Sequence, residues 1–450
     1  MVIARGDAVA LARALVQIDS RNPTLVPGAP GESEVAATLA SVLDEWGFSV
    51  RVLDALPGRP NVVARIGPSD APALMLNGHL DVVGVEGMIH EPFLAELRSG
   101  RIYGRGSADM KGGIAAMCAA ATAATAGSNA QIVIAAVADE EYESLGLRSL
   151  LESGVRAEAA IVTEPTRLAI CPAHRGFAWI DVTLAGRAAH GSRYDLGIDA
   201  ILHAGLLLAE LDALERTRSD GPTHPLLGRG SLHASRIHGG VGMSTYPERC
   251  DLAVERRTLP GETAEQAVRE ITAACDRVRA RTPGFSARVK LSTAQAPSDV
   301  PLDAQIVKRL RKALEAEGMP VRIEGLSAWT DAALLNEAGI PAVCFGPGDI
   351  SLAHAAEEFV PVVEIEQATR VLARVVRNWC GYSRHFAVDI VKGDPFAGVD
   401  AQAVRHPRRG DHERQAYRCL PPRHRVRGDP HAPPGDQGTG SSRCHTSNHG

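Results

Sequence analysis

The sequence predicts an α/β protein: a doubly wound, mostly parallel sheet in the main domain, with a smaller α+β sandwich inserted into it. Three observations support this fold class. β-rich runs alternate with helical patterns from residue 1 to about 170. Gln131–Ala138 is a continuous apolar run, which is typical of a strand covered on both faces. The pattern changes near His174 and returns at about residue 290, which indicates an insertion.

The first part of the chain begins with two helical patterns. Residues 7–18 repeat apolar side chains at helical spacing and stop before Pro23, and Glu32–Trp46 is a second amphipathic helix. An Ala-rich apolar segment predicts a third, buried helix at Ile114–Ala126. The expected strands are Ser49–Val52, Asn61–Ile66, Leu74–Leu76, Gln131–Ala138 and Ala159–Val162.

The rest of the chain divides into an insertion, a return and a tail. The insertion should contain an edge-type strand at Phe177–Leu184, helices at Asp199–Leu214 and Glu262–Ala280, and strands at Ser231–His238, Arg249–Arg256 and Ser286–Leu291. The return should contain helices at Asp303–Glu315, Asp331–Glu337 and Glu364–Cys380, and strands at Val321–Glu324 and Ala342–Phe345. We therefore expect a main domain of residues 1–173 and 290–380, an insertion of 174–289, and a disordered tail of 381–450, where Pro, Gly, Arg and His dominate.

Composition narrows the class of protein. The chain has 450 residues, 45% of them hydrophobic, which is enough for a large core. The formal net charge of −5 gives no reason to expect nucleic-acid or membrane partners. The eight cysteines include no Cys-x-x-Cys pair and predict reduced thiols. Because no secretory signal and no membrane-length apolar run is visible, we expect a cytoplasmic protein.

Polar residues follow the expected strands. His79 and Asp81 come after an apolar run, and residues two apart share one side of an extended chain. That arrangement suits a histidine metal ligand whose far ring nitrogen is held by a carboxylate. A hydrogen-bonded loop is the alternative interpretation.

Asp139-Glu140-Glu141 closes the strand Gln131–Ala138. Adjacent acids beside a buried sheet repel one another unless a cation is present. One glutamate as metal ligand and its neighbour as general base would suit metal-assisted hydrolysis. A surface turn is the alternative, and it is the common one for runs of acids.

Three further residues complete the candidate set. Asp109 stands in a glycine-rich stretch just before a helix, where α/β proteins place ligands. Glu164 ends another apolar strand, although a glutamate before a proline is often only a turn. His354 lies in a loop, where a lone histidine is more often a surface residue. Together the histidines and carboxylates favour Zn, Co or Mn over a thiolate or calcium site.

In chain order, His79-x-Asp81, Gly106-x-x-Asp109-Met110-Lys111-Gly112-Gly113, Glu140-Glu141, Glu164 and His354 resemble the signature of one metallopeptidase family. Its members include acetylornithine deacetylase, succinyl-diaminopimelate desuccinylase, aminoacylase and glutamate carboxypeptidase. The resemblance runs from about residue 8 to 380. It implies two zinc or cobalt ions bridged by Asp109, with His79 and Glu164 completing one site, and Glu141 and His354 the other. It further implies Glu140 as the base, Asp81 behind His79, and a cis peptide between Asp109 and Met110.

The resemblance extends to the insertion, which matches the lid of this family, through which its dimeric members associate. Arg187-Ala188-Ala189-His190-Gly191-Ser192 resembles the lid motif whose histidine, here His190, stabilises an oxyanion, often in the partner subunit. Arg257, before Thr258-Leu259-Pro260, matches the arginine that holds a substrate carboxylate. Ser244 stands where many relatives have a substrate-contacting asparagine, so the substrate is open at this point.

The resemblance therefore implies a binuclear metal-dependent hydrolase of N-acyl amino acids, similar to acetylornithine deacetylase, that acts as a homodimer on a small carboxylate-bearing amide. A dipeptidase or carboxypeptidase of the same family is one alternative. A metal-binding protein without catalysis is another, and the intact Glu140-Glu141 pair disfavours it.

Overall fold

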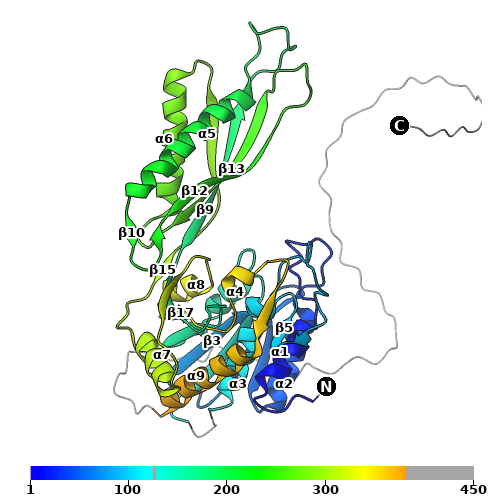
Figure 1. Ribbon diagram of the computed structural model, residues 1–450, viewed down its shortest axis with the longest axis vertical. Coiled ribbons are helices and arrows are strands. Elements are labelled where there is room, and N and C mark those ends of the chain that lie inside the picture. Colours follow the sequence, from blue (N-terminus) through cyan, green and yellow to red (C-terminus); the bar gives the residue numbers. More distant parts are fainter. Residues whose placement is uncertain (1, 125–127, 382–450) are drawn as a thin grey trace, which may run out of the picture. The chain divides into compact units, whose positions relative to one another are not determined.

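The computed structural model describes residues 2–124 and 128–381 (Figure 1). The prediction of a disordered tail at 381–450 falls, apart from Gly381, outside the described residues. The helices are α1 (Ala8–Val16), α2 (Ser33–Glu45), α3 (Gly112–Ala121), α4 (Leu145–Glu152), α5 (Ala200–Thr217), α6 (Ala264–Arg281), α7 (Gln305–Ala316), α8 (Ala332–Glu337) and α9 (Val362–Cys380), with short helical turns η1 (Ser107–Lys111), η2 (Arg218–Asp220) and η3 (Ile350–Leu352).

The strands belong to two main sheets and two small ones. The large sheet contains β1 (Ser49–Leu56), β2 (Arg59–Ile66), β3 (Ala73–His79), β6 (Gln131–Val137), β7 (Ala159–Val162), β8 (Ile170–His174), β15 (Ser298–Asp299), β16 (Ile323–Leu326) and β17 (Ala342–Cys344). The second sheet contains β9 (Gly176–Ala185), β12 (Ser231–Gly239), β13 (Arg249–Thr258) and β14 (Ser286–Gln295). The small sheets pair β10 (Thr223–His224) with β11 (Gly228–Arg229), and β18 (Phe359–Pro361) with β5 (Arg101–Tyr103) and β4 (Glu96–Arg98).

The large sheet is mixed, which corrects the prediction of a mostly parallel sheet. Its strand order is β1-β2-β6-β3-β7-β17-β8-β15, and β16 pairs with β8. The four central strands, β6, β3, β7 and β17, are parallel to one another. The flanking pairs β1–β2, β2–β6, β17–β8 and β8–β15 are antiparallel. Parallel pairing is therefore confined to the centre of the sheet and to the β8–β16 pair.

Alternate residues of the central strands face two different cores. Leu74 and Leu76 of β3 pack into the core that contains α1, α2, α3, α7 and α9. Met75, between them, packs into the opposite core with Leu147 of α4 and Leu335 of α8. Both faces of β3 and β6 are covered, which explains why the residues from Ile132 to Ala138 are all apolar.

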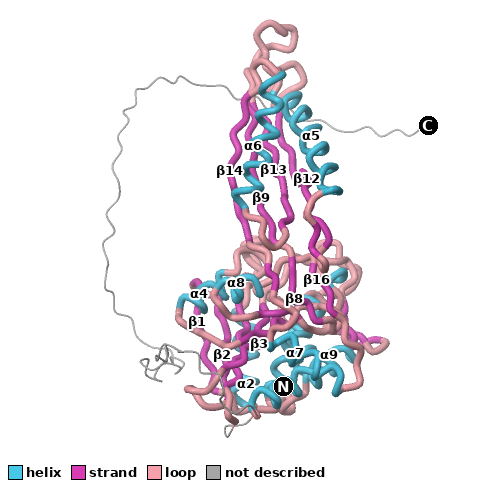
Figure 2. The backbone as a smooth tube through the Cα atoms, turned by 90° about the vertical axis from the view of Figure 1, so that its left-hand side faces the viewer, coloured by secondary structure: helices cyan, strands magenta, loops and turns pink. Residues whose placement is uncertain are grey.

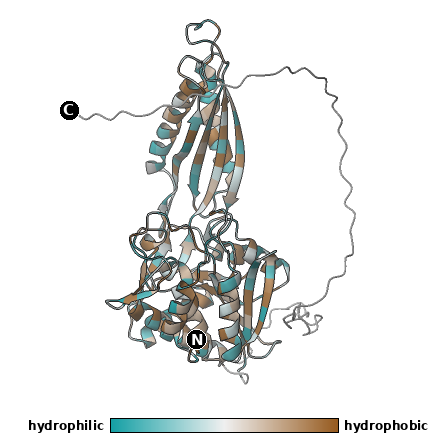
Figure 3. Ribbon diagram, turned by 90° about the vertical axis from the view of Figure 1, so that its right-hand side faces the viewer, coloured by the Kyte–Doolittle hydropathy of each residue, from teal (hydrophilic) through white to brown (hydrophobic). Residues whose placement is uncertain are grey.

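The second sheet is antiparallel, in the order β12-β13-β9-β14, and α5 and α6 lie along one face of it (Figures 1 and 2). Apolar and polar side chains alternate along its strands, as the bands in Figure 3 show. Only the face of this sheet that α5 and α6 cover is apolar, so Phe177–Leu184 alternates apolar and polar residues. That alternation led to the prediction of an edge strand. The structure instead places β9 inside the sheet, between β13 and β14.

The chain passes between the two sheets twice. It leaves the large sheet after His174 of β8 and enters the second sheet at Gly176 of β9. It returns between Gln295 of β14 and Ser298 of β15. Among the described helices, none combines the length and apolar character that a membrane crossing requires.

Candidate metal centre

Four neighbouring parallel strands deliver candidate residues to one edge of the large sheet. His79 is the last residue of β3, and Glu140 and Glu141 follow β6. Glu164 follows β7, and His354 lies in the loop after β17. Because β6, β3, β7 and β17 are consecutive and parallel, their carboxyl ends meet at the same edge, where α/β proteins bind ligands.

Asp109 reaches the same place from η1, just before α3. The Asp109–Met110 peptide is cis, as expected from the family resemblance. Glu358 holds this segment, because its Oε1 accepts the backbone N–H groups of Ala108 (3.1 Å) and Asp109 (3.2 Å). Its other oxygen pairs with Arg105 Nη1 at 2.6 Å, and both side chains are buried. The aspartate therefore projects from a fixed backbone.

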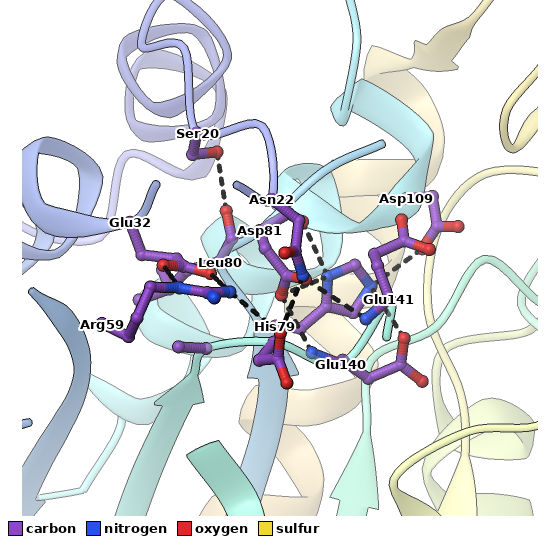
Figure 4. A network of polar contacts seen from close by, with 12 residues as sticks. Ser20, Asn22, Glu32, Arg59, His79, Leu80, Asp81, Asp109, Glu140 and Glu141 are labelled. Atoms are coloured by element: carbon purple, nitrogen blue, oxygen red, sulfur yellow. Dashed lines mark hydrogen bonds and ion pairs between the residues drawn. The ribbon is translucent and has the colours of Figure 1, made fainter. Parts of the chain in front are cut away.

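The side chains of His79, Asp109 and Glu141 converge on one small volume (Figure 4). His79 Nε2 lies 3.0 Å from Asp109 Oδ1. His354 Nε2 lies 3.0 Å from Glu141 Oε2 and 3.5 Å from the second oxygen of Asp109. One ligand atom each from His79, Asp109 and Glu141 can be chosen so that all lie within 4.8 Å of one another. A single cation could contact all three.

Glu140 and Glu164 lie beside this cluster. Glu140 Oε2 is 4.0 Å from His79 Nε2, and the glutamate side chain is only 10% exposed. Glu164 is buried, and its Oε1 has no hydrogen-bond partner among the described residues. A buried carboxylate oxygen without a donor is costly, so the site fits a cation that this oxygen would bind.

The electrostatics of the cluster also favour a cation. Burial raises the pKa values of Glu140, Glu141 and Glu164, and the neighbouring carboxylates raise them further. Burial opposes protonation of His79, but its hydrogen bond with Asp109 and the nearby acids outweigh that effect and raise its pKa. The hydrogen bond with Glu141 raises the pKa of His354 to about 9. The buried acids thus lack compensating positive charge, which a divalent cation would supply.

The contact between Asp81 and His79 differs from the predicted one, because it is made by the backbone of Asp81 and not by its carboxylate. His79 Nδ1 lies 2.9 Å from the backbone carbonyl of Asp81, whereas the Asp81 carboxylate is 3.7 Å away. A carbonyl partner makes Nδ1 the donor, which leaves the Nε2 lone pair available for a metal. The Asp81 carboxylate instead accepts the backbone N–H groups of Glu140 (3.1 Å) and Glu141 (3.2 Å).

The structure does not join the remaining predicted residues to this cluster by any described contact. His190 and Ser244 are exposed neighbours, since His190 bridges to Thr245, and the N–H of Gly191 donates to the Ser244 carbonyl at 2.7 Å. Arg257 pairs with Phe177 near the first residue of β9, whereas His190 follows the last residue of that strand. The guanidinium carbon of Arg257 is 5.4 Å from the centroid of the Phe177 ring. Arg257 also pairs with Glu255 at 2.9 Å.

Sequence reasoning missed three buried polar residues around the site. Asn22 contacts Asp81, Glu358 holds Asp109, and both oxygens of Asp331 lack a hydrogen-bond partner among the described residues. Burial raises the pKa of Asp331 to about 7. The sequence hid Asp331 because an aspartate at the start of a predicted helix looks like an ordinary cap, whereas in the structure its side chain makes no capping hydrogen bond.

Comparisons with known proteins agree with this geometry. Residues 75–378 match the model of peptidase family M20/M25/M40. The chain is 34% identical to acetylornithine deacetylase from Myxococcus xanthus, over 75% of this chain and 90% of the relative. It is 30% identical to N-formyl-4-amino-5-aminomethyl-2-methylpyrimidine deformylase from Halalkalibacterium halodurans, over 82% and 94%.

Solved structures share the fold at lower identity. A tripeptidase from Staphylococcus aureus superposes with a TM-score of 0.70 at 20% identity, covering 84% of this chain and all of that one. A dinuclear metal-binding peptidase of the M20 family from Bacillus subtilis gives a TM-score of 0.62 at 17% identity, over 83% and 96%. The chain therefore belongs to peptidase family M20/M25/M40, and it is a metal-dependent hydrolase of amide bonds.

Proposed function

We propose that this chain removes the acyl group of an N-acyl amino acid, using two divalent cations, Zn, Co or Mn. The observation that carries the proposal is the convergence of His79, Asp109, Glu141 and His354 within contact distances of 3.0–3.5 Å. The relatives described above include enzymes named for the removal of acetyl and formyl groups from amines. Removal of a small acyl group is the activity common to those names.

In this proposal Asp109 would be a ligand of both cations. His79 and Glu164 complete one coordination set, and Glu141 and His354 complete the other. The two oxygens of Asp109 support this division, because Oδ1 faces His79 at 3.0 Å and Oδ2 faces His354 at 3.5 Å. When bound, the cations would polarise the scissile carbonyl and lower the pKa of a water molecule towards about 7.

Glu140 is the proposed general base. Its backbone is fixed by Asp81, and its side chain lies beside the cluster at 4.0 Å from His79 without joining it by a hydrogen bond. From there the carboxylate can take a proton from the attacking water and return it to the leaving amine. Burial raises the pKa of Glu140, which matches a group that must exchange protons.

The second sheet, with α5 and α6, is the proposed lid, and two copies of the chain would associate through it. His190 lies beyond the Ala185 end of β9, and the ten residues of that strand span roughly 30 Å of extended chain. His190 would therefore serve the site of a second copy, as an oxyanion donor. Arg257 would bind the substrate carboxylate, and Ser244 would contact the substrate. A cytoplasmic location, without nucleic-acid or membrane partners, remains a prediction.

Substitution of Glu140 tests the base assignment. Glu140→Gln should keep the metal content of the wild-type protein, because the side chain is outside the proposed ligand set. It should lower kcat by roughly 10²–10⁴-fold, the usual contribution of a general base. Near-normal kcat in a metal-loaded Glu140→Gln protein would exclude this glutamate as the base.

A substrate panel separates the alternatives. The protein, supplied with Zn, Co or Mn in separate reactions, is offered N-acetyl and N-formyl amino acids beside dipeptides and peptides with a free carboxyl end. Faster release of acetate or formate supports the deacylase. Preferential cleavage of the peptides would make the chain a dipeptidase or carboxypeptidase, and metal binding without any turnover would favour a non-catalytic metal protein.

A further inference from the structure

The loop that carries Glu140 and Glu141 is held at both ends by buried carboxylates. Asp81 accepts the backbone N–H groups of Glu140 and Glu141, at 3.1 and 3.2 Å. Asp139 accepts those of Glu143 and Leu145 through its Oδ2, at 3.3 and 3.4 Å. Four main-chain donors of one short loop thus point at two side chains, neither of which the proposed reaction uses directly.

Asn22 joins these two carboxylates, and Figure 4 shows it beside Asp81. Its Nδ2 lies 2.8 Å from Asp81 Oδ2 and 3.0 Å from Asp139 Oδ1, so each of its two N–H bonds has an acceptor. Its Oδ1 accepts the backbone N–H of Thr24 at 3.0 Å, which fixes the orientation of the amide. Asn22 is fully buried and far from Asp81 and Asp139 in sequence.

An uncharged donor is the group that this position requires. Asp81 and Asp139 are buried acids that approach the same nitrogen, and two like charges in a dry environment repel. Arg59 contacts Asp139 at 3.0 Å, but its other hydrogen bonds go to the buried Glu32. Asn22 stabilises both carboxylates by hydrogen bonding without adding a charge that would attract Glu140 or Glu141.

We propose that Asn22 is a positioning residue for catalysis: by bridging Asp81 and Asp139 it holds the Glu140–Glu141 loop in its working geometry. This inference rests on the proposed function, since it takes Glu140 as the base. Asn22 contacts neither Glu140 nor Glu141 itself in any described interaction. Its effect should therefore pass through the two carboxylates and the four backbone N–H groups that they accept.

Ser20 provides a matched control in the same segment. Its hydroxyl is fully buried and donates to the carbonyl of Leu80 at 2.7 Å, so Ser20→Ala also breaks one hydrogen bond between this segment and the end of β3. Unlike Asn22, Ser20 makes no described contact with Asp81 or Asp139. The two variants thus separate support of the fold from positioning of the catalytic loop.

The test compares Asn22→Ala with Ser20→Ala as metal-loaded full-length proteins, using the N-acyl amino acid that the panel shows to be turned over fastest. For Asn22→Ala we expect kcat to fall roughly 100-fold, the cost of displacing a catalytic group by about 1 Å. KM should stay within about threefold of wild type, because displacement of the catalytic loop alone leaves substrate binding largely intact. All proteins are compared at saturating metal, since Glu141, a proposed ligand, lies on the same loop. Ser20→Ala should keep kcat within about threefold of the wild-type value, even if its melting temperature falls as far as that of Asn22→Ala.

Three results would overturn the inference: equal kcat values for the two variants, a loss confined to KM, or full recovery of Asn22→Ala by excess metal. If Asn22→Ala does not fold, Asp139→Ala removes the acceptor at the other end of the bridge and should lower kcat similarly. Glu140→Ala is measured in parallel. An active Glu140→Ala protein refutes the proposed function, whereas an inactive one beside a normal Asn22→Ala protein refutes only the positioning role.

Discussion

Lys111 lies two residues after Asp109, and its side chain is completely buried. Its Nζ donates to the carbonyl of Ile18 at 2.8 Å. Burial lowers the pKa of Lys111 from 10.5 to about 7, against the opposing influence of Asp19, Glu358 and Asp81. Methionine has a similar length and no charge, so Lys111→Met removes the titration while keeping most of the packing.

The size of the effect follows from this pKa shift. Between pH 7 and pH 10.5 the unfolded chain binds the Lys111 proton and the folded protein does not, so wild-type stability falls as the pH falls through this window. The shift of 3.5 units corresponds to about 5 kcal/mol. Lys111→Met removes this penalty but leaves the Ile18 carbonyl unpaired, at a cost of about 1–3 kcal/mol. Near pH 7 the variant should therefore be more stable, by about 2–4 kcal/mol.

Urea denaturation at several pH values measures the difference in unfolding free energy between variant and wild type. The advantage of Lys111→Met should shrink by about 1.4 kcal/mol per pH unit between pH 7.5 and pH 10, and reverse near the upper end. Lys290→Met, at an exposed position of β14, serves as the control. A difference that does not change with pH would show that Lys111 stays charged when buried, and the reasoning would fail.

Three other substitutions probe the site. Glu358→Gln should lower the unfolding free energy by about 3–5 kcal/mol in urea denaturation, because Arg105 loses its buried partner. The double variant with Arg105→Met should lose less stability than the sum of the two single variants. Additive losses would contradict the pairing. Glu164→Gln replaces a buried acid whose raised pKa makes it costly to keep in the metal-free protein at neutral pH, so calorimetry should show a higher melting temperature for the chelator-treated variant. Competition with a chromophoric chelator should show metal affinity weaker by roughly tenfold or more, whereas unchanged affinity would remove Glu164 from the ligand set. Arg257→Lys should raise KM roughly tenfold for carboxylate-bearing substrates with little change in kcat, and an equal rise for an amide lacking the carboxylate would rule out that contact.

The sequence predicted the parallel centre of the sheet and pointed to the histidines and carboxylates that converge at its edge, because both leave local signals. His79, Glu140 and Glu164 each follow an apolar run, and the end of such a run fixes where a polar side chain emerges. Asp109 stands out in a glycine-rich stretch. These signals place residues on strand ends, and parallel pairing then brings the strand ends together.

The edges of the sheet could not be predicted in the same way. The direction in which a strand runs leaves no mark on its own apolar pattern, so the antiparallel pairing of β1, β2, β8 and β15 was hidden. β8 contains Pro172, which normally argues against an interior strand. α4 is short and contains Gly146, so its sequence resembles a loop.

The polar residues that support the site are hidden for a different reason. Asn22 lies 59 residues from Asp81, and Glu358 lies 249 residues from Asp109. Single polar residues in loops carry no periodicity, and only the folded chain reveals which distant N–H group each of them meets. Sequence patterns therefore pointed to the residues of the proposed metal site, and missed the polar residues that hydrogen-bond to them from behind.

Glu358 and Asp81 hold their partners in the same manner, each accepting two successive amide hydrogens of a segment that bears a proposed ligand. The grip is on the peptide backbone and does not depend on which side chain projects from it. The backbone at Asp109 and Glu141 should therefore keep its position when the proposed ligand side chain is replaced. Exchanging aspartate, glutamate or histidine there should retune which cation is preferred while the surrounding architecture stays unchanged.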